Sequence, residues 1–172
     1  RAFVLAINDK EWRAITTALT LFPFLQERLN VEASNHVFLS TASAHKMHEL
    51  TELFKLKCIA QKLTVTTVSR ALSYILSRNE YEHDSDLSLL KSLLDFKDAD
   101  GVGLGADAIE TAYLQAVKNG RVNSLKLIQA LPNLSQAPME LIIEAVKEAA
   151  VHKYYNMVLH LLQMIPSDRR LE

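Results

Sequence analysis

Two apolar helix faces separated by a single glycine, within residues 108–131, constrain the fold more than any other feature of the sequence. The first face is formed by apolar side chains three and four positions apart, namely Ile109, Ala112, Tyr113, Ala116 and Val117. This spacing lines one side of an α-helix, and that side must be buried. A second apolar series follows Gly120 and ends at Pro132. Helices joined by so short a turn lie antiparallel, and because an isolated pair cannot cover its own apolar faces, neighbouring helices are required.

Local signals set the ends of the first helix. Asp107 precedes the apolar series and Glu110 follows three residues later, which predicts that Asp107 caps the helix. Gly120 can adopt the left-handed backbone conformation that ends a helix at little steric cost. We therefore expect the helix to begin just after Asp107 and the chain to reverse at Gly120.

The same pattern recurs along the chain. Downstream, Pro138 opens an apolar helical series that extends to residue 149, and a second series occupies residues 154–165. Upstream, helix pairs are predicted at 68–76 with 87–94, at 36–44 with 47–63, and at 2–8 with 12–22, the last closed by Pro23. In helix 47–63 the predicted buried stripe comprises Met47, Leu50, Phe54 and Cys58. No segment shows a strand pattern.

These five pairs predict an all-α fold of stacked antiparallel helix pairs, a short α-solenoid, in one domain that spans residues 1–172. The small residues within the first helices are Ala6, Thr41, Ala71, Ala116 and Ala145, at intervals of 35, 30, 45 and 29 residues. These intervals fit helical repeats but vary widely. An irregular helical bundle has the same periodicity and is the alternative fold. Three of the four glycines lie in residues 98–107, so we expect a hinge or projecting loop at 97–107.

Composition excludes several classes of function. The 19 basic and 20 acidic residues leave a net charge of −1, so the chain has no positive electrostatic field that would attract the phosphates of a nucleic acid. A single cysteine, Cys58, cannot form an intramolecular disulfide, and this indicates a reducing, cytoplasmic location. No apolar run is long enough to cross a membrane. Because the chain opens on Arg1, we expect a fragment of a longer protein.

Residues 113–131, YLQAVKNGRVNSLKLIQAL, resemble the helix–turn–helix of an ankyrin repeat, with a small residue at Ala116, a glycine at Gly120 and the polar Arg121 beside it. Residues 139–165 resemble the same unit with an inserted half-turn, and residues 2–22 share part of it. The family's Thr-Pro-Leu-His motif is absent. The array is similar to the degenerate ankyrin-like arrays of some host-directed bacterial proteins.

The resemblance implies a non-catalytic module that binds a protein partner through the concave surface formed by its first helices. By position, the partner-binding residues would be Gln115, Lys118 and Asn119 in the best repeat, and Glu144, Lys147 and Glu148 in the last. Tyr155 is added because aromatic side chains with a polar group dominate binding hot spots. An accessory domain that positions the substrate of a larger enzyme is the alternative, and an enzyme built on an irregular bundle is a third possibility. The oligomeric state is not determined by the sequence.

Candidate chemical sites are weak, and we predict no catalytic residue, metal or cofactor. His45 and His48 could face one metal ion, but the sequence supplies no third ligand. Residues 96–107 resemble a calcium loop, except that Phe96 occupies the first ligand position. The glycines at 101, 103 and 105 lack the preceding strand of a dinucleotide site. Cys58 lies on an apolar stripe, which predicts a buried and unreactive thiol.

Overall fold

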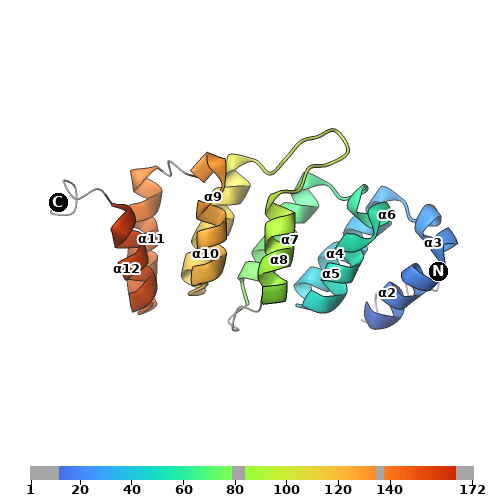
Figure 1. Ribbon diagram of the computed structural model, residues 1–172, viewed down its shortest axis with the longest axis horizontal. Helices are drawn as coiled ribbons and strands as arrows, with labels where there is room; N and C mark the ends of the chain where they lie inside the picture. Colours follow the sequence, from blue (N-terminus) through green and yellow to red (C-terminus); the bar gives the residue numbers. More distant parts are fainter. Residues whose placement is uncertain (1–11, 79–83, 135–137, 166–172) are drawn as a thin grey trace. The chain divides into compact units, whose positions relative to one another are not determined.

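The protein is all-α in the residues that the structure describes. This computed structural model describes residues 12–78, 84–134 and 138–165, where helices follow one another in neighbouring pairs (Figure 1). Within these ranges, β geometry is limited to an isolated bridge between Lys97 and Gly103. The all-α prediction is therefore confirmed. The predicted helix at 2–8 and the side chain of Trp12 lie outside the described residues.

The chain forms two compact units, residues 1–75 with 88–104 and residues 76–87 with 105–172. The chain passes from the first to the second between Leu104 and Gly105, within the stretch predicted as a hinge. Hinge motion there stays a prediction, as does the assignment of all 172 residues to one domain.

The first unit contains α2 (Trp12–Leu21), α3 (Pro23–Arg28), α4 (Val31–Ser43), α5 (Met47–Lys55), α6 (Lys57–Ala60), α7 (Val65–Leu76) as far as Ile75, and α8 (Asp84–Leu94) from Ser88 onward. In its core, α5 packs against α2, α4 and α6. The ring of Phe54 lies between those of Phe38 and Phe96, with centroid distances of 6.0 and 6.4 Å. A long-range tie comes from Asn35 on α4, whose amide donates to the carbonyl oxygen of Lys62 at 2.9 Å and accepts from the N–H of Thr64 at 3.0 Å.

The prediction of one helix at residues 47–63 is wrong. Leu56 has an extended backbone, with φ −74° and ψ 108°, which ends α5 and resets the helical phase before α6. As a result Leu50, Leu53 and Ile59 are fully buried, whereas Cys58 and Phe54 are half-buried. The expectation of a buried Cys58 is therefore also wrong.

The boundary predicted at Pro23 needs a similar correction. Pro23 is the first residue of α3, a position that suits its fixed φ and missing N–H. Phe22 therefore stands between two helices and is 48% exposed, outside the stripe formed by Ile15 and Leu19.

The second unit contains two hairpins, α9 (Ala106–Lys118) with α10 (Val122–Gln129), and α11 (Met139–Val151) with α12 (Tyr155–Met164), linked by the 3₁₀ turn Pro132–Leu134. Within each hairpin the two helices pack together, and α9 also packs against α11. The start of α9 corrects the predicted cap, because Gly105 is the N-cap residue and Asp107 lies in the first turn. Asp107 there still favours the helix through the helix dipole.

Three hairpin turns have the same hydrogen-bond pattern, which defines the register of the repeat. His45, Gly120 and Lys153 have positive φ angles of 55°, 67° and 60°. The N–H group of the next residue donates to a carbonyl oxygen five residues earlier, that of Thr41, Ala116 or Ala149. This is the Schellman arrangement that ends many helices. It also shows that Ala149, rather than Ala145, is the equivalent of Ala116, and that the final pair has no inserted half-turn.

In this register α11 follows α9 by 33 residues, since 139 − 106 and 151 − 118 both equal 33. Buried side chains recur in the four first helices, at 34, 37, 38, 41 and 42 of α4, at 67, 68, 71, 72, 75 and 76 of α7, at 109, 112, 113, 116 and 117 of α9, and at 141, 142, 145 and 149 of α11. All of them align with buried positions of α9 except Thr67 and Leu141. The predicted buried faces of α7 and α9 are therefore confirmed. The wide intervals found in the sequence came partly from using Ala145 as the reference.

Candidate functional site

The first helices of the second unit enclose a groove that is open to solvent. It lies between α9 and α11, has a volume of about 270 Å³, and is lined by Thr111, Leu114, Gln115, Lys118, Glu144 and Glu148. Four of these residues are among the seven predicted from the sequence to bind a partner. The structure thus brings residues from two predicted repeats to one place.

The α9 wall of the groove follows from helical spacing. Thr111, Leu114, Gln115 and Lys118 lie three or four positions apart, so they share one side of α9. The opposite side of α9 carries the buried residues Ala112, Ala116 and Tyr113. Sequence reasoning missed Thr111 and Leu114, although their position one turn before Gln115 and Lys118 is a signal that could have identified them.

The lining of the groove combines apolar surface with charges of both signs. Leu114 supplies its largest apolar side chain, α9 contributes the charged Lys118, and α11 contributes Glu144 and Glu148. Among the described residues, neither Lys118 nor Glu144 has an ion pair within 4.0 Å; Glu148 lies 3.8 Å from Nδ1 of His152. Lys118 and Glu144 in the lining can therefore form new ion pairs with a ligand.

The other predicted residues do not line this groove. Asn119 is the C-cap residue of α9, and its side-chain amide donates to the carbonyl oxygen of Gln115 at 2.9 Å, which is a structural role. Lys147 is exposed on α11 outside the lining. Tyr155 is 72% exposed.

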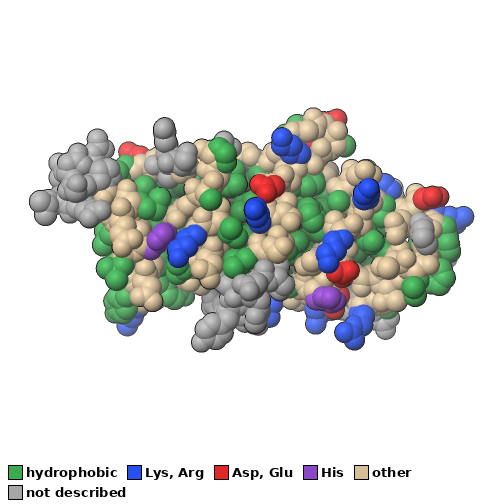
Figure 2. Space-filling view, viewed as in Figure 1, with side chains coloured by type: hydrophobic (Ala, Val, Ile, Leu, Met, Phe, Trp, Pro, Cys, Tyr) green, Lys and Arg blue, Asp and Glu red, His purple; other side chains and the backbone are tan. Residues whose placement is uncertain are grey.

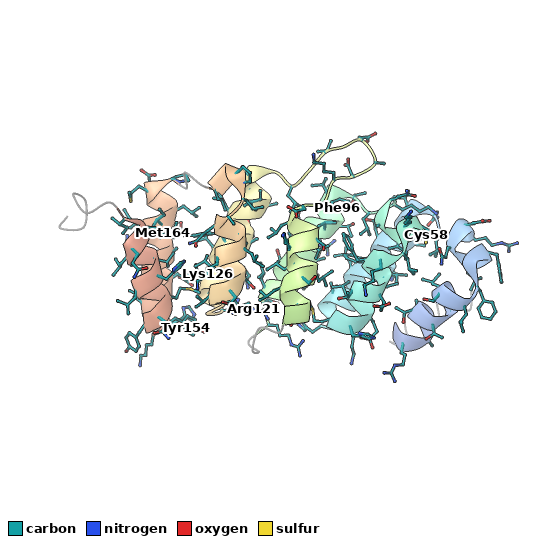
Figure 3. The ribbon with its side chains drawn as sticks, viewed as in Figure 1. Cys58, Phe96, Arg121, Lys126, Tyr154 and Met164 are labelled. Carbon is teal, nitrogen blue, oxygen red and sulfur yellow. The ribbon has the colours of Figure 1, made fainter. Side chains whose placement is uncertain are left out.

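Tyr155 instead contributes to a second hollow, of about 330 Å³, at the turn end of the two hairpins. Its lining includes Gly120, Val122, Lys153 and Tyr154. Figure 3 shows Tyr154 and Arg121 at this end of the unit. The buried Arg121 donates from Nε to the carbonyl oxygen of Arg78 at 3.2 Å. These contacts hold the turn, and we assign the hollow no ligand.

The structure adds no support for the candidate chemical sites that were considered from the sequence. Within the described ranges, no group of three or more histidine, cysteine, aspartate or glutamate side chains could hold a metal ion. In the 97–104 loop, which stands beyond the helix ends in Figure 1, the Asp98 carboxylate accepts from the N–H groups of Asp100 and Val102. Partial burial raises the pKa of the Cys58 thiol and outweighs the opposite effect of the nearby Lys62, so the sulfur stays protonated.

Comparisons with protein families, with curated proteins and with solved structures found no match. In the part of the chain that the structure describes, no helix is both long and apolar enough to span a lipid bilayer.

Proposed function

We propose that this protein is a non-catalytic interaction module that binds a polypeptide partner in the groove between α9 and α11. The observation that carries the proposal is the convergence of Gln115, Lys118, Glu144 and Glu148 around one open groove. These residues come from equivalent helices of two repeats, as expected for a surface that repeat proteins use for binding. A cytoplasmic location belongs to the same proposal.

The hairpin register supports an ankyrin-like interpretation. Its 33-residue offset between α9 and α11 equals the period of ankyrin repeats. Gly120 has the positive φ that the turn requires. The 13-residue length of α4, α9 and α11 is a further regularity of the array.

The groove favours a segment that combines apolar and charged side chains. An apolar side chain of the ligand can bury Leu114 further. This burial contributes roughly 25 cal/mol to the free energy of binding for each Å² of apolar surface removed from water. The charged side chains of the groove orient the ligand and speed its association more than they raise its affinity.

The proposal is tested by exchanging charges across the groove at constant net charge. The variant Lys118→Glu with Glu144→Lys reverses both walls, and the matched control Lys97→Glu with Asp95→Lys reverses an exposed pair in the first unit. We expect proteins captured by the wild type to be retained by the control and lost by the groove variant, measured by quantitative mass spectrometry. Equal capture by both variants would show that this groove is not the binding surface.

A further inference from the structure

The charges of the second unit are unevenly distributed between the first and second helices of its hairpins. The first helices, α9 and α11, contain more acidic than basic residues, namely Asp107, Glu110, Glu140, Glu144 and Glu148 against Lys118 and Lys147. The sequences of α10 and α12 contain no acidic residue, and Lys126 is their only lysine or arginine. Figure 2 shows the side of the unit where α10 and α12 lie, with basic and histidine side chains among apolar ones. The groove between α9 and α11 therefore lies among the acidic side chains of this unit.

Within the groove the carboxylates outnumber the cations. Glu144 and Glu148 of α11 belong to the lining, and Lys118 of α9 is its one basic side chain. The α9 equivalents of the two glutamates, 33 residues earlier, are the neutral Thr111 and Gln115, which also line the groove. Neither of these side chains can neutralise a carboxylate of the neighbouring helix.

Lys118 is displaced from the two carboxylates along the helix direction. Its equivalent on α11 is Val151, three residues after Glu148 and seven after Glu144. At about 1.5 Å per residue, these offsets correspond to about 4.5 and 10 Å along the axis. In the described part of the chain, no ion pair within 4.0 Å links Lys118 to Glu144 or Glu148. The negative charge of this wall is therefore left for a ligand to neutralise.

Glu144 and Glu148 do not stabilise the helix that carries them. With Glu140 they follow one another at intervals of four residues, a spacing at which like charges repel on a helix surface. Glu148 also lies in the last turn of α11, where the helix dipole disfavours a carboxylate. Local helix stability therefore does not account for these two acidic side chains, and residues that oppose a local rule are expected at functional sites.

The size of the groove favours a polypeptide ligand over a small molecule. Pockets for small molecules typically have volumes of about 300–1,000 Å³, enclose most of the ligand and have aromatic side chains in their walls. This groove has a volume of about 270 Å³, is open to solvent and has no aromatic side chain in its lining. It can accept individual side chains of a longer chain. Leu114 suits an apolar one, and Glu144 and Glu148 suit an ammonium or guanidinium group.

We propose that the groove binds a segment of a partner protein in which an arginine or lysine side chain adjoins an apolar one. The inference rests on the function proposed above and adds the chemistry of the ligand. The cation lies between Glu144 and Glu148, where a guanidinium group has enough donors for both carboxylates, while the apolar side chain covers Leu114. Lys118 repels a second cation at the C-terminal end of α9, so a mixed segment is favoured over a purely basic one.

The test is the selection of binding peptides from a phage-displayed library of random sequences, with the full chain as the target. We expect the recovered peptides to be enriched in arginine or lysine next to an apolar residue. The variant Glu144→Gln with Glu148→Gln removes both carboxylates of the groove. The matched control Glu27→Gln with Glu32→Gln removes two exposed carboxylates of the first unit. A synthetic copy of the most enriched peptide should bind the groove variant about tenfold more weakly than the wild type or the control, measured by fluorescence anisotropy.

Two further measurements separate binding from a structural role. Lys118→Gln should bind the same peptide at least as tightly as the wild type, because it removes a repelling charge. The urea midpoint of the groove variant should equal or exceed that of the wild type, because the loss of Glu144 and Glu148 relieves repulsion within α11. The proposal would be overturned by a selection that recovers no peptide or peptides without basic residues. Equal binding by the groove variant, or weaker binding together with a lower urea midpoint, would also overturn it.

Failure of this inference is distinguishable from failure of the proposed function. If the charge-exchange variant loses the captured proteins while the selected peptides have no basic residue, the groove binds a partner of different chemistry. If that variant retains the captured proteins, the groove is not the surface that binds them, whatever peptides the selection recovers.

Discussion

The substitution Gly120→Ala tests the hairpin turn on which the register of the second unit depends. Gly120 has φ +67°, and a Cβ atom added there would lie 3.0 Å from two carbons of the Tyr154 ring. The substitution therefore has two free-energy costs. One arises from the left-handed backbone of residue 120, and the other from the crowding of the Tyr154 ring by the new methyl group.

The size of the loss can be estimated from these two costs. A left-handed backbone costs alanine about 1–2 kcal/mol. Crowding a packed side chain with one added methyl group costs about 1–3 kcal/mol. Alanine also restricts the unfolded chain, which offsets about 0.4–1 kcal/mol. The midpoints of these ranges give a net loss of about 3 kcal/mol in the free energy of unfolding.

Urea unfolding followed by far-ultraviolet circular dichroism measures this loss. In a Tyr154→Ala background the ring is absent, so Gly120→Ala should cost only about 1 kcal/mol. Lys153 occupies the equivalent position of the next hairpin with φ +60°, where Lys153→Gly should change stability by less than about 1 kcal/mol and in the favourable direction. A loss below about 0.5 kcal/mol for Gly120→Ala, or the same loss with and without the Tyr154 ring, would refute the reasoning.

Three further predictions concern other contacts. Asn35→Ala removes the hydrogen bonds to Lys62 and Thr64 and should lower the free energy of unfolding by about 1–2 kcal/mol, whereas an unchanged urea midpoint would contradict the structural role of Asn35. Asn30→Ala removes the bond that its side-chain oxygen accepts from Ala33 N–H at 2.8 Å and should cost about 1 kcal/mol; Asn30→Gly should cost less. Burial, and secondarily Lys126, lowers the pKa of His160 in the folded protein, so the unfolded chain binds the proton more tightly. The contribution of His160 to stability is therefore complete above the unfolded pKa of about 6.5 and is lost as the pH falls through the lower folded pKa, a dependence that His160→Gln should weaken in urea titrations at several pH values.

The periodicity of apolar residues was sufficient to predict the all-α fold, because a buried helical face must recur every three to four residues whatever surrounds it. The faces of α7 and α9 and the reversal at Gly120 were predicted for this reason. Gln115, Lys118, Glu144 and Glu148 were chosen from their positions in equivalent helices, and the packing of α9 on α11 placed them around one groove.

Other features depended on tertiary packing. Leu56 and Gly105 set helix ends that apolar spacing does not specify, because a break or a cap depends on the backbone angles of one residue. Likewise, Ile143 and Leu159 have the same apolar character as core residues such as Ile142 and Leu161. The sequence by itself determined which residues are apolar and which helices they form. Only the tertiary structure decided which of those apolar faces are covered, because burial is a property of neighbouring helices and not of the helix that carries the side chain.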